Sequence, residues 1–121
     1  QSPEEKFITL FQNQFAFFKI NPHFVVAVFS DGLLEESQRI NETILKIMGV
    51  KMKHLGPIIL EGQQKHVFTN TINSEELMNV VMGTFRLQMF KWRVANFQFD
   101  IGKSGDDMIN SVLKLIKEKS K

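Results

Sequence analysis

One stretch of the chain, NVVMGTFRLQMFKWRVANF (residues 79–97), becomes apolar on two opposite sides when it is placed on a helical wheel. Successive residues of an α-helix turn by about 100°, and this rotation separates the apolar residues into two stripes. The first stripe consists of Met78, just before the stretch, and of Val81, Met82, Phe85, Met89 and Trp92. The second consists of Val80, Gly83, Leu87, Phe90 and Val94. Because an ordinary surface helix carries one apolar stripe, this helix requires a second packing partner.

The composition is that of a single globular domain. Of the 121 residues, 43% are hydrophobic and 23% are charged, and the 12 phenylalanines without any tyrosine favour dry interior surface. A net charge of +2 is too weak to indicate nucleic-acid binding, and the lack of cysteine excludes disulfides and thiolate metal sites. No apolar run approaches the roughly 20 residues of a membrane span, and no signal peptide opens the chain. We therefore expect a cytoplasmic protein with no membrane partner.

Helix-start signals at four places predict an all-α fold. Each consists of a capping residue followed by a proline or by an acidic residue three positions later. The signals are Ser2 with Pro3 and Glu5, Asn21 with Pro22, Asn73 with Glu76, and Ser104 with Asp107.

Apolar periodicity predicts helices over about residues 3–19, 22–30, 36–65, 79–97 and 106–119. Residues 22–30 (PHFVVAVFS) are β-branched enough for a strand, but only KHVFTNTI could pair with them, so we predict a helix. The third helix, of about 30 residues, would span roughly 45 Å. This helix would be longer than a compact domain of 121 residues is wide, so we expect a bend at Gly56-Pro57.

The last predicted helix also has an unusually wide apolar face, made of Met108, Ile109, Val112, Leu113, Leu115 and Ile116. Two consecutive helices with surplus apolar surface predict that two copies of the chain form an intermolecular four-helix bundle. The alternative is a core completed within one chain. The residues predicted at the dimer interface are Val80, Gly83, Leu87, Phe90, Val94, Ile109, Val112, Leu113 and Ile116.

Several motifs, in this order, resemble the C-terminal regulatory domain of the TetR (tetracycline repressor) family of transcription regulators. They are NPHFVVAVFSD, RINETILKIM, the EGQQK end of the third helix, the NSEEL restart and MGTFRLQMFKW. The resemblance covers nearly the whole chain. It implies an all-helical, TetR C-terminal-domain-like bundle that dimerises through its last two long helices and keeps a small-molecule pocket among the first, third and fourth long helices.

The resemblance also implies a helix-turn-helix module of roughly 50 residues before this domain, which would bind duplex DNA in the complete regulator. Because QSPEE opens directly on the first regulatory helix, we expect residues 1–121 to be a single regulatory domain separated from its helix-turn-helix module. We expect this domain alone not to bind DNA. Relatives often carry a glycine four residues after Gly62, where this chain has His66. A left-handed helix end is easy for glycine and only tolerable for histidine, so the local turn geometry is in question.

No catalytic constellation is present. The three histidines have no close spacing to each other or to acids, and GKSG lacks the spacing of a phosphate-binding loop, so we expect no enzyme activity, metal or cofactor.

The family's pocket makes a set of phenylalanines and methionines candidates for contact with a small hydrophobic or amphipathic effector, although such stripes are more often simple core. These candidates are Phe11, Phe15, Phe18, Met48, Met52, Met82, Phe85 and Met89. Three polar residues within apolar stripes, Gln14, Lys51 and His54, join them because they would be costly to bury without a partner. Lys51 could pair with an acidic ligand, or its ammonium group could extend into water. The alternative function is a ligand-free helical dimerisation module of an adaptor protein.

Overall fold

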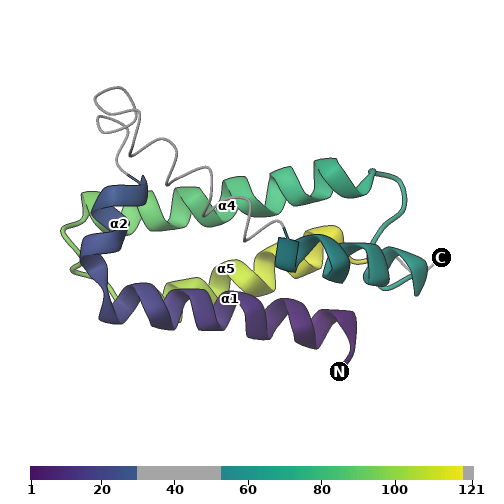
Figure 1. The fold of residues 1–121 in the computed structure, drawn as a ribbon, viewed down its shortest axis with the longest axis horizontal. Helices are drawn as coiled ribbons and strands as arrows, with labels where there is room; N and C mark the ends of the chain where they lie inside the picture. The colour runs from purple at the N-terminus through teal and green to yellow at the C-terminus, as the bar shows by residue number, and fades with distance from the viewer. Residues whose placement is uncertain (30–52, 119–121) are drawn as a thin grey trace.

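The computed structural model describes residues 1–29 and 53–118, and these residues form helices joined by short turns (Figure 1). Helix α1 covers Pro3–Ile20, α2 covers Pro22–Phe29, α4 covers Ser74–Val94 and α5 covers Ile101–Ile116. A further helix runs over residues 53–64. Within the described ranges the only β-type pairing is an isolated antiparallel bridge between Phe68 and Lys117. The all-α prediction is confirmed, and so is the prediction that α2 is a helix and not a strand.

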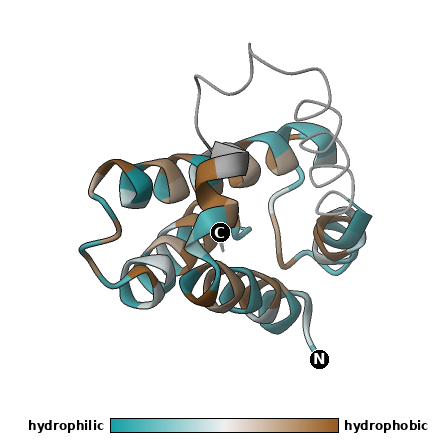
Figure 2. Cartoon of the chain, turned by 60° about the vertical axis from the view of Figure 1, so that its left-hand side comes forward, coloured by the Kyte–Doolittle hydropathy of each residue, from teal (hydrophilic) through white to brown (hydrophobic). Residues whose placement is uncertain are grey.

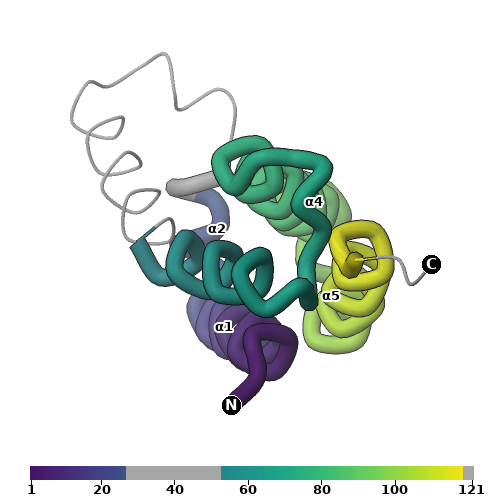
Figure 3. The backbone as a smooth tube through the Cα atoms, turned by 90° about the vertical axis from the view of Figure 1, so that its right-hand side faces the viewer, coloured from purple at the N-terminus to yellow at the C-terminus, as the bar shows by residue number. Residues whose placement is uncertain are grey.

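The helices surround one core. Helix α5 packs against both α1 and α4, and α2 packs against α4 and the end of α1. Figure 3 shows the bundle nearly end-on, with α1, α4, α5 and residues 53–64 around a common centre. Apolar and polar residues alternate around the helices in Figure 2, as expected for helices with one buried face.

Two predicted N-caps hold α1 and α4 in place. The hydroxyl oxygen of Ser2 accepts a hydrogen bond from the backbone N–H of Glu5 at 3.2 Å, as expected of an N-cap. The Glu5 carboxylate accepts from the Ser2 hydroxyl at 3.1 Å, whereas in a capping box it would accept from the Ser2 backbone N–H. The side chain of Asn73 accepts from the Glu76 N–H at 2.9 Å. Asn21 acts differently, because its side-chain amide donates to the Phe17 carbonyl at 2.9 Å. It therefore closes the end of α1, and Pro22 alone marks the start of α2.

The start of α5 was predicted wrongly. The N-cap is Asp100, whose carboxylate accepts from the N–H groups of Gly102 and Lys103 at 2.9 and 3.3 Å. Ser104 lies inside the helix, where its hydroxyl accepts a hydrogen bond from the Gln88 amide at 2.9 Å. Burial explains the longer helix: Ile101 is fully buried, and a Cβ at Gly105 would approach the ring of Phe15 to 2.6 Å. Packing against α1 thus overrides the turn-like composition of GKSG.

The third predicted helix is confirmed where it is described. Residues 53–64 remain helical across Gly56 and Pro57, and Leu55 and Ile59 on their inner face are fully buried. Residues 36–52 of this predicted helix lie outside the described ranges, so the bend at Gly56-Pro57 stays a prediction.

The turn that ends this helix has the left-handed C-cap geometry that glycine usually provides, although the residue in that conformation is His66. His66 has φ of 58°, in the left-handed region, and the carbonyl of Gly62 accepts from the N–H groups of Val67 and Phe68 at 2.8 and 3.0 Å. Gly62 is required here for another reason, because a Cβ at this position would overlap the ring of Phe68.

Candidate functional site

A cluster of phenylalanine rings occupies the centre of the bundle and contains four of the predicted effector contacts. Phe85 of α4 is fully buried, and its ring centroid is 5.4 Å from Phe11, 5.2 Å from Phe15 and 6.4 Å from Phe18. The three α1 residues are four and three positions apart, so they share one face of that helix. The side chains of the cluster offer only apolar surface, and their rings are in direct contact with one another.

The other predicted contacts divide into three groups. Met89 is fully buried beside the cluster, and Met82 and Gln14 are partly exposed at its margin. His54 is exposed on the surface, whereas Leu55 and Ile59 form the buried side of the same helix, so His54 does not join the cluster. Met48, Lys51 and Met52 lie outside the described residues.

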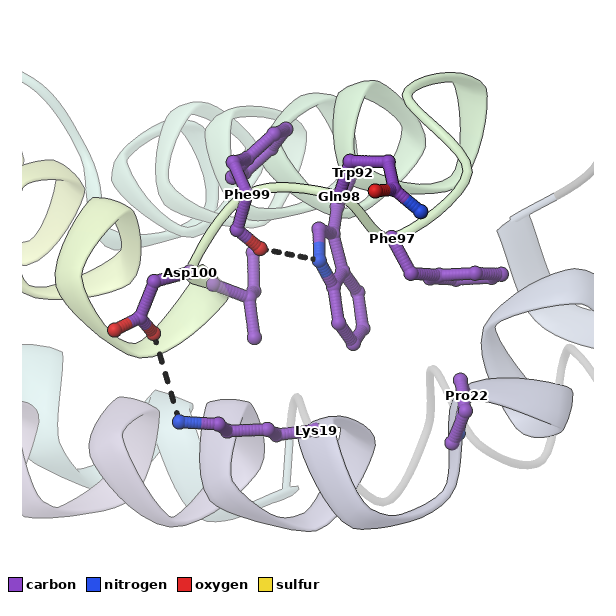
Figure 4. A pocket seen from close by; sticks show the side chains of 8 residues that line it. Lys19, Pro22, Trp92, Phe97, Gln98, Phe99 and Asp100 are labelled. Carbon is purple, nitrogen blue, oxygen red and sulfur yellow. Dashed lines mark hydrogen bonds and ion pairs between the residues drawn. The ribbon is translucent and has the colours of Figure 1, made fainter.

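A separate hollow of about 430 Å³ opens at the end of the bundle, between the junction of α1 and α2 and the turn that joins α4 to α5 (Figure 4). The indole N–H of Trp92 donates to the Phe99 carbonyl at 2.9 Å, and the ring of Phe97 stands edge-on to the indole at 4.8 Å. Lys19 approaches Asp100 to 3.6 Å across the hollow. The hydrogen bond from the Lys103 N–H, helped by the Lys19 charge and the Gly102 N–H, holds the pKa of Asp100 below its usual value.

Sequence reasoning missed this turn because it contains no glycine. Asn96 and Phe97 have φ values of 54° and 62°, a left-handed conformation that is rare for a bulky residue such as phenylalanine. Their N–H groups donate to the carbonyls of Arg93 and Trp92 at 3.0 and 2.9 Å, and the Trp92 ring packs on Phe97. The conformation is thus held by contacts that local propensity does not encode. None of the predicted effector residues that the structure describes lines this hollow.

The two stripes predicted for α4 separate cleanly in the structure. Val81, Phe85, Met89 and Trp92 of the first stripe are buried, and Met78 and Met82 pack against the core while partly exposed. On the opposite side, 48% of Val80, 57% of Leu87 and 59% of Val94 is exposed to solvent. Gly83 is exposed and Phe90 half-buried on that side. We call the set Val80, Gly83, Leu87, Phe90 and Val94 the α4 outer face.

The predicted contribution of α5 to a dimer interface does not fit the structure. Ile109, Val112, Leu113 and Ile116 are between 1% and 3% exposed, because α1 and α4 both pack on α5 and cover its wide apolar face within the chain. These four residues therefore have no surface left for a partner. Leu115, which is 73% exposed, is the large apolar residue that α5 does present outward.

Ion pairs gather at the other end of the bundle, around the first turns of α1. Glu61 accepts from Lys6 at 2.8 Å and from Lys65 at 2.9 Å, and Lys117 lies 2.9 Å from Glu4. The hydrogen bonds from Lys6 and Lys65 lower the pKa of Glu61 from its ordinary value of 4.5 to about 2. These contacts join α1, residues 53–64 and the end of α5, and they carry no arrangement suited to catalysis.

No group of three or more histidine, aspartate or glutamate side chains within the described ranges could hold a metal ion. No helix in residues 1–29 and 53–118 is long and apolar enough to cross a membrane.

Comparison with known proteins fits this architecture. The family model described as "YsiA-like protein, C-terminal region", one of the TetR C-terminal domain families, matches residues 1–117. The chain belongs to this family. No curated protein and no solved structure gave a match. The chain is therefore a TetR-family C-terminal domain. Domains of this type are the regulatory parts of transcription regulators.

Proposed function

We propose that this TetR-family domain is the effector-sensing and dimerisation part of a transcription regulator, and that two copies pair through the α4 outer face. The observation that carries the proposal is the exposure of Val80, Leu87 and Val94 on one side of a helix whose other side is core. An exposed apolar stripe along a whole helix is typical of a surface that a partner covers.

The partner we propose is a second copy of the chain. In a twofold dimer the same surface patch of each subunit meets its own copy. The apolar stripe of one subunit can therefore pack against the identical stripe of the other, and together they form the centre of the interface. Stable interfaces bury about 1,200–2,000 Å² in total and have an apolar centre with a polar rim. On α5, Leu115 is exposed and apolar, and we propose that it, and not the buried residues Ile109, Val112, Leu113 and Ile116, represents α5 in the four-helix bundle.

The effector we propose is a small hydrophobic or amphipathic compound that enters between α1 and α4. Phe11, Phe15, Phe18 and Phe85 would supply apolar contact, and Met82 and Met89 can adapt their shape to different ligands. Gln14, at the margin, would offer the polar contact, and Met48, Lys51 and Met52 stay candidates from the sequence. Effector binding would favour one packing of the helices and so modulate DNA binding by a preceding helix-turn-helix module.

A dimerisation module without a ligand is the second candidate. The observation that favours it is the close packing of the phenylalanine cluster, whose ring centroids lie 5.2 to 6.4 Å apart around Phe85. Such spacing is ordinary for rings in direct contact.

Native mass spectrometry of the purified chain tests both parts of the proposal. We expect a dimer that carries the additional mass of a co-purified small molecule, which solvent extraction removes. In a thermal-shift screen, an apolar compound at 100 times its Kd should stabilise the domain by about 2.7 kcal/mol. A dimer with no added mass, and no response to a broad set of apolar and amphipathic compounds, would favour the ligand-free module. A monomer would contradict the proposal.

A further inference from the structure

Gly83 lies in the interior of α4, where no contact among the described residues (1–29 and 53–118) explains a glycine. The helix runs from Ser74 to Val94, so Gly83 is near its middle, far from either cap. Glycine destabilises a helix interior relative to alanine. A Cβ added at Gly83 would meet no atom within 4 Å.

Two other glycines show what an internal explanation looks like. A Cβ at Gly62 would overlap the ring of Phe68, and one at Gly105 would approach Phe15 to 2.6 Å, so both let a neighbouring ring lie against the backbone. Gly83 has a helical conformation, not a left-handed one, so backbone geometry does not require glycine either.

The surroundings of Gly83 indicate what approaches it from outside. Val80 lies three residues before it and Leu87 four residues after it, and both are about half exposed on the same side. A small residue between two larger apolar ones forms a notch into which another helix can pack closely.

We infer that Gly83 is the point at which α4 of a second copy crosses, in antiparallel orientation, with the two backbones in close approach. The inference rests on the proposed homodimer and adds the crossing point and the orientation. A crossing centred beside Gly83 places Val80 of each copy against Leu87 of the other, so each notch receives apolar side chains.

The charges along α4 favour the antiparallel orientation. Its first turn carries Glu75 and Glu76, and its last turn carries Lys91 and Arg93. In the antiparallel crossing, Glu76, seven residues before Gly83, lies near Lys91 of the other copy, eight residues after it. A parallel pairing would instead place acid beside acid and base beside base.

Cysteine cross-linking tests the crossing point. The chain has no cysteine, so Gly83→Cys introduces a single thiol, and within one chain a Cβ at this position meets no atom within 4 Å, so that any crowding comes from the second copy. A disulfide requires Cα atoms about 4.4–6.8 Å apart, which a close crossing provides. We expect oxidation to convert most of the Gly83→Cys dimer into a covalent dimer. Ala16→Cys, at an exposed position of α1, is the matched control and should stay uncross-linked.

Charge reversal tests the orientation. Glu76→Lys and Lys91→Glu should each raise the dimer Kd about tenfold at low salt, and the double variant should return it to near the wild-type value. Sedimentation equilibrium measures the three constants, and circular dichroism checks that each variant is folded.

The outcomes separate this inference from the proposed function. A wild-type dimer in which Gly83→Cys cross-links no better than Ala16→Cys overturns the crossing point and leaves the homodimer in place. Efficient cross-linking with a double charge variant no better than the singles overturns the antiparallel orientation. A monomeric wild-type chain overturns the proposed dimer and the inference with it.

Discussion

Leu87→Asp is the substitution for which the fold of one chain and the proposed dimer predict opposite results. In the isolated chain, Leu87 is 57% exposed, so an aspartate there remains hydrated. Surface substitutions of this kind usually change the free energy of unfolding by less than about 0.5 kcal/mol. A lone domain should therefore tolerate the change.

In the proposed dimer, Leu87 lies near the centre of the interface. Complete burial of a leucine side chain contributes about 1.5–3 kcal/mol, and the exposed 57% of Leu87 corresponds to about 1–2 kcal/mol of this. Twofold symmetry doubles the effect to about 2–4 kcal/mol, so Leu87→Ala should weaken association by roughly 30- to 700-fold, at tenfold per 1.4 kcal/mol. Leu87→Asp adds a desolvation penalty of several kcal/mol per ion, which should make the chain monomeric at micromolar concentration.

Light scattering coupled to size-exclusion chromatography gives the mass, and urea unfolding gives the stability of each chain. Leu113→Ala is the matched control, because Leu113 is 3% exposed in the core and its truncation should cost about 2–5 kcal/mol in unfolding. A folded dimer of Leu87→Asp as tight as the wild type would refute the assignment of the α4 outer face. An unfolded Leu87→Asp monomer would refute the exposure on which the argument depends.

Two further predictions concern the fold. Gly105→Ala should overpack the contact with Phe15 and lower the free energy of unfolding by about 1–3 kcal/mol in urea titrations, and an unchanged midpoint would contradict this contact. The pKa of Glu61 is lowered to about 2, so the stabilisation from its ion pairs is complete above its ordinary pKa of 4.5 and is lost as the pH falls through 2. Between pH 4.5 and 2 the wild type should therefore lose more stability than Glu61→Gln, and parallel pH profiles would show that the pairs with Lys6 and Lys65 do not contribute.

The parts of the fold that depend on local signals could be predicted from the sequence. The caps at Ser2 and Asn73 form the predicted hydrogen bonds, because a capping residue acts on the N–H group three positions later. The two stripes of α4 also separate as predicted, because helical periodicity alone determines which residues share a side.

The parts that depend on tertiary contacts could not be predicted. The GKSG stretch has the composition of a turn, and only the burial of Ile101 and the contact between Gly105 and Phe15 make it helical. The turn at Asn96 and Phe97 has no glycine, because the Trp92 ring and backbone hydrogen bonds hold its left-handed residues.

The α5 interface prediction was wrong for a related reason. The width of an apolar face shows how much surface must be buried, but it does not show which chain buries it. In α5 the chain's own helices α1 and α4 cover Ile109, Val112, Leu113 and Ile116. Among the predicted effector contacts, helical periodicity places Phe11, Phe15 and Phe18 on one face of α1, and their rings lie beside Phe85. The surface position of His54 depends on how residues 53–64 rotate against the core.

The mass of the wild-type chain in solution tests the central claim most directly, because we propose that a second copy covers the α4 outer face. One chain has a mass of 14.0 kDa. Light scattering at concentrations from nanomolar to millimolar should give twice this mass, about 28 kDa, down to the dimer Kd, with dissociation below it. A constant mass of 14.0 kDa across this range would contradict the account, because Val80, Leu87 and Val94 would then face water in the functional molecule.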